Sequence, residues 1–219
     1  MTINRPSGPH QGQPILHTGA EIGEARLAMI MIHGRGADAA SILTLAESFE
    51  RHDVAYLAPE AAGHAWYPNT FLAPVERNEP GRSSGLTLIA GILNELDQRD
   101  LPPEKVALLG FSQGACLALE FAARAPRRYG AVIGLSGGLI GEAIDPEEYE
   151  GSLAGTPVFL GCSDRDAHIP LARVQETTNV LRRLGGEVVE RIYPGMGHTV
   201  SDDEIAEVRR LLEEMAAAP

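Results

Sequence analysis

Short, nearly continuous apolar runs alternate along this chain with longer amphipathic segments, and this alternation restricts the folds open to it. Runs such as LAMIMI, VALLG and PVFLG are typical of strands covered by helices on both faces. The pattern predicts strands at Arg26–His33, Val54–Pro59, Lys105–Phe111, Tyr129–Leu135, Thr156–Gly161 and Glu187–Tyr193. It predicts helices at Ala39–Arg51, Ser83–Arg99, Gly114–Ala125, Pro170–Leu184 and Asp202–Ala217. Alternating strands and helices indicate an α/β fold with an open, mostly parallel sheet flanked by helices.

Length and the N-terminal composition bound the domain organisation. The 219 residues suit a single α/β domain, which we place at residues 15–219, after a polar, partly ordered arm at residues 1–14. That arm lacks the basic flank and apolar core of a signal peptide, and no apolar run approaches the ~18 residues of a membrane span. We therefore expect a cytoplasmic protein without stable membrane association.

Charge and cysteine content argue against several function classes. With 30 acidic and 18 basic residues the formal charge is −12, which repels phosphates, so no nucleic-acid partner is expected. Cys116 and Cys162 have neither CxxC spacing nor a neighbouring histidine cluster, so neither a metal site nor a disulfide framework is expected. The composition leaves open whether the chain forms a homodimer.

Two Gly-x-Ser-x-Gly pentapeptides occur, around Ser112 and Ser136, and their surroundings differ. A nucleophile elbow has a strand before the serine and a helix directly after it, because the tight turn exposes the hydroxyl and the helix N-terminus stabilises developing negative charge. Ser112 follows VALLGF and precedes the helix former ACLALEFAARA, and Gly114 permits close helix–strand approach. Ser136 precedes GGLIGEAIDPEE, whose glycines and proline oppose an immediate helix. The context favours Ser112 as nucleophile and a simple turn at Ser136.

The elbow also predicts its partners, because in this arrangement an acid and then a histidine follow the nucleophile, each on a loop after a later strand. His198 lies directly after the last predicted strand. The acid lies in GCSDRDAHIP, where spacing does not choose between Asp164 and Asp166. His168 is a rival base, but it precedes the final strand. The predicted triad is Ser112, one of the two aspartates and His198, in which the aspartate orients the imidazole.

The substrate side of the site is predicted from two loops. An oxyanion hole needs two backbone N–H groups, expected from Gln113, next to the nucleophile, and from Arg35 in HGRG. The Arg35 guanidinium would either face solvent or recognise an acidic substrate. The long Glu60–Arg82 connection carries a cluster that would form either a pocket wall or a local hydrophobic plug. Its candidate pocket residues are Trp66, Tyr67 and Phe71.

With these motifs in order, the chain resembles the phospholipase/carboxylesterase family of α/β-hydrolases, which includes acyl-protein thioesterases. The resemblance extends from about Ala28 to Leu212 and rests on IHGRGAD, APEAAGHAWYP, GFSQGACLALEFA, GLSGG, DAHIP and PGMGH. The family places its acid in Asp-x-x-Val/Ile-Pro, so the resemblance selects Asp166 and implies a triad that acts without a cofactor. HGRGAD departs from the common HGxGD, and Pro68 stands where thioesterases often have Asp, which makes protein depalmitoylation doubtful.

The resemblance implies a serine hydrolase that cleaves small or short-acyl carboxylic esters through an acyl-enzyme, with thioesters and lysophospholipids as further candidate substrates. Because the chain is too short for a large cap domain, we expect an open cleft. One alternative is a lactonase resembling dienelactone hydrolases, whose nucleophile is cysteine; the serine at the elbow argues against it. Another is a binding protein on a hydrolase scaffold, against which the three ordered triad residues argue.

Overall fold

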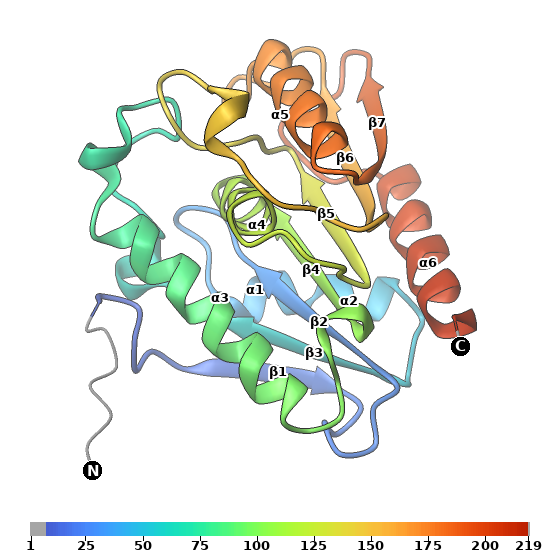
Figure 1. Cartoon of the computed structure of the whole chain (residues 1–219). Coiled ribbons are helices and arrows are strands. Elements are labelled where there is room, and N and C mark those ends of the chain that lie inside the picture. The colour runs from blue at the N-terminus through green and yellow to red at the C-terminus, as the bar shows by residue number, and fades with distance from the viewer. Residues whose placement is uncertain (1–7, 219) are drawn as a thin grey trace.

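The computed structural model describes residues 8–218, which form one seven-stranded sheet with helices on both faces (Figure 1). The strands are β1 (Ile15–Gly19), β2 (Leu27–Ile32), β3 (Val54–Pro59), β4 (Val106–Phe111), β5 (Ala131–Leu135), β6 (Pro157–Ser163) and β7 (Glu187–Tyr193). The α-helices are α1 (Ala39–Leu43), α2 (Leu45–Ser48), α3 (Gly81–Asp97), α4 (Gln113–Arg124), α5 (Leu171–Arg183) and α6 (Asp202–Ala217). Single 3₁₀ turns lie at Ala62–His64, Val75–Asn78, Pro103–Lys105 and Pro146–Glu148. The predicted mostly parallel α/β architecture is confirmed.

The order of the strands brings the predicted loops to one edge of the sheet. The order is β1-β3-β2-β4-β5-β6-β7, in which β1 pairs antiparallel with β3 and every other neighbouring pair is parallel. The carboxyl ends of β2, β4, β6 and β7 therefore point the same way, and the connections that follow them lie together. Parallel sheets of this kind build their sites at that edge.

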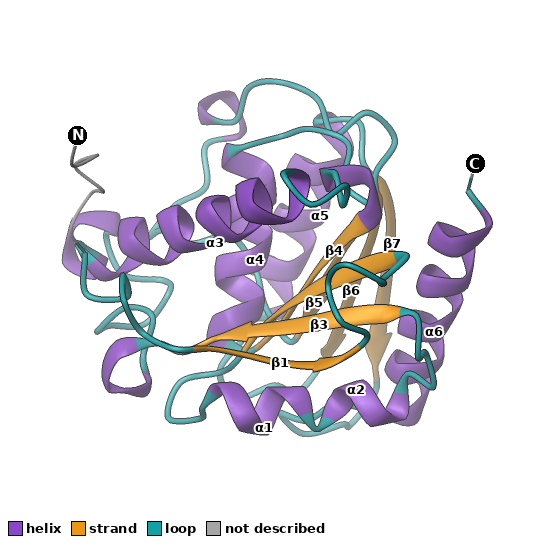
Figure 2. Ribbon diagram, turned by 90° about the horizontal axis from the view of Figure 1, so that it is seen from below, coloured by secondary structure: helices purple, strands orange, loops and turns teal. Residues whose placement is uncertain are grey.

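The apolar strands are buried on both faces, as their continuous hydrophobic runs predicted. Figure 2 shows α3, α4 and α5 on one face of the sheet and α1, α2 and α6 on the other. The sheet separates two hydrophobic cores, and alternate residues of β2 belong to each. Ala28, Ile30 and Ile32 lie in one core, and Leu27, Met29 and Met31 lie in the other. None of the helices within residues 8–218 combines the length and apolar character needed to cross a bilayer.

Two elements differ from the sequence prediction. β1 was not predicted, because ILHTG is short, all its residues are exposed, and it has neither a continuous apolar run nor a clear alternation. The single helix predicted at Ala39–Arg51 is two short helices, divided at Thr44. The Thr44 hydroxyl donates to the Ser41 carbonyl at 2.7 Å, a local bond of the kind that competes with regular helix.

Of the polar, partly ordered arm expected at residues 1–14, residues 1–7 lie outside the described residues, and the rest contacts the domain through His10. His10 is 1% exposed. Its ring bridges two main-chain groups, with Nε2 2.9 Å from the Trp66 carbonyl oxygen and Nδ1 accepting from the Ala62 N–H at 3.1 Å. The segment thus helps to fix the loop after β3, a role that its polar composition did not indicate.

Candidate active site

Ser112 occupies the tight turn between β4 and α4. Its backbone has φ 55° and ψ −119°, a conformation that side-chain-bearing residues rarely adopt and that presents the hydroxyl at the top of the turn. Both glycines of the pentapeptide are needed for space. A Cβ at Gly114 would lie 2.0 Å from the Ile32 carbonyl oxygen, and one at Gly110 would lie 2.2 Å from the Gly114 carbonyl oxygen. The glycines therefore allow α4 to start directly behind the serine.

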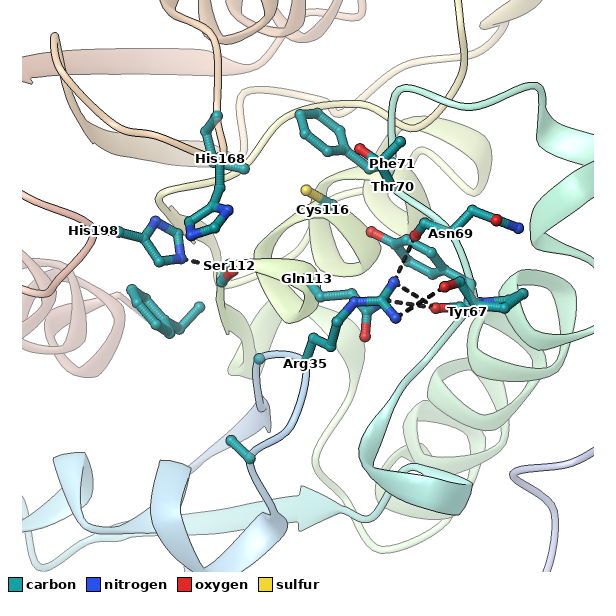
Figure 3. A pocket seen from close by; sticks show the side chains of 15 residues that line it. Arg35, Tyr67, Asn69, Thr70, Phe71, Ser112, Gln113, Cys116, His168 and His198 are labelled. Carbon is teal, nitrogen blue, oxygen red and sulfur yellow. Dashed lines mark hydrogen bonds between the residues drawn. The ribbon is translucent and has the colours of Figure 1, made fainter.

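The structure brings Ser112, His198 and Asp166 together although they are far apart in the sequence. His198 Nε2 lies 2.8 Å from Ser112 Oγ, a contact drawn in Figure 3, and His198 Nδ1 lies 2.7 Å from Asp166 Oδ2. An Nδ1–H that donates to the carboxylate leaves Nε2 free to accept the serine proton. The arrangement can therefore activate the hydroxyl for attack on a carbonyl carbon.

The Asp166 side chain is fully buried and has a partner for each oxygen. Oδ1 accepts from the N–H groups of His168 at 2.8 Å and Ile169 at 3.1 Å, and Oδ2 faces His198. Burial alone would raise the pKa of Asp166, but the hydrogen bonds from His198 and the two N–H groups outweigh it and hold this pKa below its ordinary value. The carboxylate is therefore ionised at neutral pH, as a partner of an imidazolium must be.

Asp164, which spacing alone could not distinguish from Asp166, has a different place. Its Oδ1 accepts from the Gly195 N–H at 2.7 Å, in the loop that leads from β7 to His198. The Ser163 hydroxyl bonds to the Met196 carbonyl in the same loop. Asp164 and Ser163 thus hold the loop that carries the histidine, and neither is hydrogen-bonded to the imidazole ring.

Two rings enclose the His198 imidazole. The Phe111 ring centroid lies 5.0 Å away, and the His168 ring approaches edge-on at 4.8 Å. His168, the rival base, is exposed and makes no hydrogen bond to Ser112 among the described residues. Its position beside the base is that of a cavity-lining residue.

Ser136 has a similar backbone but a different environment. Its φ is 54°, yet the residue is 0% exposed, and its Oγ is buried without a hydrogen-bond partner in the described part of the chain. No helix follows it directly; the next α-helix is α5. Unlike Ser112, it does not line the cavity at the site.

The loop after β2, which carries HGRG, approaches Ser112. A Cβ built on Gly34 would lie 3.4 Å from the Ser112 Cβ. Within residues 8–218, the backbone N–H groups of Arg35 and Gln113 donate no hydrogen bond, so both are free for a substrate oxygen. His33 is buried and structural: its Nε2 accepts from the Ala61 N–H at 3.1 Å, and its Nδ1 lies 2.8 Å from the Gly34 carbonyl oxygen.

A cavity of about 480 Å³ opens beside Ser112, a size suited to a small ligand. Tyr67 and Phe71 line it, together with Gly34, Arg35, Ala37, Pro68, Asn69, Thr70, Phe111, Gln113, Cys116, His168, Ile169 and His198. Trp66, predicted as a wall residue, does not line it. This side chain is 0% exposed, and its indole N–H donates to the His33 carbonyl at 2.9 Å. The wall interpretation of Trp66 is corrected: the indole supports the loop after β2 from within the core.

Cys116 lies one helical turn after Ser112 and also lines the cavity. Burial raises the pKa of its thiol to about 12, so it carries no thiolate at neutral pH. A cysteine nucleophile of the dienelactone-hydrolase type is therefore disfavoured by the electrostatics as well as by the motif.

Sequence reasoning missed the side-chain contacts that join the site's loops. Arg35 is exposed, as one of the two expectations had it, but its guanidinium also donates to the carbonyls of Tyr67, Pro68 and Asn69. Phe111 was also missed as a neighbour of the imidazole. The sequence signal for this contact was that Phe111 directly precedes Ser112 at the end of β4.

Comparison with known proteins agrees with this fold. A sequence model of the phospholipase/carboxylesterase family matches residues 16–216. The crystal structure of a phospholipase/carboxylesterase from Dyadobacter fermentans is 38% identical and superimposes with a TM-score of 0.89, covering 92% of this chain and 97% of that chain.

Acyl-protein thioesterases of fungi are more distant relatives. Acyl-protein thioesterase 1 of Debaryomyces hansenii is 30% identical over 131 residues, which are 59% of this chain and little more than half, 56%, of that protein. Acyl-protein thioesterase 1 of Saccharomyces cerevisiae is 26% identical over 91% of this chain and 97% of that one. The chain belongs to the phospholipase/carboxylesterase family of α/β-hydrolases, a family of ester hydrolases.

Proposed function

We propose that this chain is a serine esterase that hydrolyses small or short-acyl carboxylic esters through a covalent acyl-enzyme. The observation that carries the proposal is the unbroken Ser112–His198–Asp166 hydrogen-bond chain, with contacts of 2.8 and 2.7 Å, at the edge of the cavity. Serine, imidazole and carboxylate in this order are the parts that acyl transfer requires.

In the proposed reaction, Ser112 Oγ bonds to the ester carbonyl carbon while His198 Nε2 takes the hydroxyl proton. The Arg35 and Gln113 N–H groups stabilise the oxyanion. Collapse of the tetrahedral intermediate breaks the carbon–oxygen bond to the alcohol, which leaves with the proton from His198. Water then attacks the acyl-serine with His198 again as base, releasing the carboxylic acid and restoring the serine.

The charge of Asp166 supports the proposal, because His198 becomes an imidazolium in both acylation and deacylation. The lowered pKa of Asp166 keeps a negative charge 2.7 Å from His198 Nδ1, where it stabilises that cation and fixes the tautomer. Thioesters present the same acyl carbonyl to the same nucleophile, so the proposal extends to them as second substrates. Tyr67 and Phe71 supply an apolar wall for the acyl group.

Hydrolysis of p-nitrophenyl butyrate by wild type, Ser112→Ala and Ser136→Ala tests the proposal. We expect Ser112→Ala to lower kcat by about three orders of magnitude or more, because triad members act as a unit. Ser136→Ala removes the buried hydroxyl of the second pentapeptide. Its kcat should stay within about twofold of the wild-type value. Equal activity of wild type and Ser112→Ala would remove the proposed nucleophile.

A further inference from the structure

The cavity wall at residues 66–69 lacks the backbone pairing that fixes most loops. Among the described residues, this segment makes no backbone-to-backbone hydrogen bond. Its position therefore depends on side chains from other elements. One is the buried Asn78, whose Oδ1 accepts from the Asn69 N–H at 3.0 Å.

Arg35 makes the largest set of these contacts. Its Nη1 donates to the Pro68 carbonyl at 3.0 Å, and its Nη2 donates to the carbonyls of Tyr67 at 2.7 Å and Asn69 at 2.5 Å, the bonds fanning out from the guanidinium in Figure 3. Within residues 8–218 the guanidinium forms no ion pair with a carboxylate. Three successive carbonyls thus take the place of a charged partner, and they accept from the two Nη atoms of the planar guanidinium.

Gln113 also holds this segment with its side chain. Its Oε1 accepts from the Trp66 N–H at 2.8 Å, and its Nε2 donates to the Tyr67 carbonyl at 2.9 Å. The Tyr67 carbonyl therefore accepts from both Arg35 and Gln113. The two residues whose backbone N–H groups are free at the nucleophile hold the cavity wall with their side chains.

We infer that Arg35 is a positioning residue that determines acyl specificity: its guanidinium fixes the position of the wall at residues 66–69 relative to the loop after β2. The inference rests on the proposed function. A long acyl chain would contact the wall at residues 66–69, which the Arg35 side chain holds, while the Arg35 backbone N–H donates to the oxyanion. A short acyl group would contact the oxyanion donors but not this wall.

The test compares p-nitrophenyl acetate with p-nitrophenyl hexanoate, whose acyl chain is four carbons longer. Arg35→Met keeps the backbone N–H and removes the fork. Arg35→Lys keeps the charge but places its three donors on one nitrogen, so it does not reproduce the two-nitrogen fork. We expect both variants to lower the hexanoate-to-acetate ratio of kcat/KM by about tenfold, with KM for hexanoate rising more than KM for acetate.

The matched control is Arg128→Met. Arg128 also donates to two main-chain carbonyls, those of Ala154 and Gly155. It lies just before the amino end of β5, whereas Ser112 follows the carboxyl end of the parallel strand β4. This variant should leave the ratio unchanged, even where its loss of Tm equals that of Arg35→Met.

Unchanged ratios in both Arg35 variants would overturn the inference, whatever happens to overall activity or Tm, because a merely structural role affects the two esters alike. Wild-type protein that hydrolyses neither ester would instead contradict the proposed function. The two failures are thus distinguishable in one experiment.

Discussion

Asp166 and Asp164 lie only two positions apart, but they have different hydrogen-bond partners in this site. Asp166 is buried, accepts from two N–H groups and faces the imidazole, so its charge is fixed where a cation would form. Asp164 holds the Gly195 N–H in the loop before His198. The first is assigned to chemistry under the proposed function, and the second to the position of the loop.

Asp166→Asn should lower kcat for p-nitrophenyl butyrate by roughly three to four orders of magnitude, because the amide stabilises the wrong imidazole tautomer and cannot balance an imidazolium. Asp164→Asn keeps the acceptor oxygen for Gly195 and should stay within about tenfold of wild type. Steady-state kinetics on the two variants gives the ranking. A larger loss in Asp164→Asn would reverse the assignment.

How far the sequence predicted the site depended on the kind of residue. Ser112 and His198 were placed by strand ends, which apolar patterning locates well. The choice of Asp166 over Asp164 came from family resemblance, because spacing along one loop does not say which carboxylate turns inward. Trp66 was a candidate for the pocket wall or for a buried plug, and the sequence could not choose, because an aromatic side chain in a long loop packs according to contacts distant in sequence, here with His33.

At the scale of elements, the junction of β4 with α4 carries the most constraint. Gly114 lets the first turn of α4 pack against the end of β2, beside the loop that carries Arg35. The continuous apolar strands made this junction predictable. The exposed edge strand β1 was not, because its residues have no core-facing pattern to reveal it.

Gly114→Ala should destabilise the fold by about 3 kcal/mol, because the added Cβ would lie 2.0 Å from the Ile32 carbonyl oxygen, and main chain cannot yield as a side-chain tip does. Gly91→Ala is the control within a helix: a Cβ there has no neighbour within 4 Å, and the change should stabilise by roughly 0.5–1 kcal/mol. Chemical denaturation measures both. Similar stabilities for the two variants would contradict the close packing at the junction.

At the scale of the whole molecule, two long connections meet above the sheet. The Gly141 N–H donates to the Phe71 carbonyl at 2.8 Å, which joins the loop after β5 to the loop after β3. Buried Arg173, from α5, donates to the carbonyls of Leu139 and Gly141 and so fixes the second loop. The sequence predicted the Glu60–Arg82 connection as long, but not that the loop after β5 would bond to it, since such a contact depends on the closed fold.

This arrangement, with loops rather than a separate cap around the cavity, leads to an expectation for substrate length. Across a series of p-nitrophenyl esters, kcat/KM should be highest for short acyl chains, because the cavity of about 480 Å³ bounds the buried part of the substrate. A value of kcat/KM that rises steadily beyond about ten carbons would contradict this expectation.

The central claim is that Ser112 is an activated nucleophile. Its most direct test is the intact mass of the protein after treatment with a fluorophosphonate, followed by peptide mapping of the adduct. We expect one adduct, on Ser112, that is absent from Ser112→Ala and from His198→Ala. No adduct on the folded wild-type protein, or an adduct on Ser136, would contradict it.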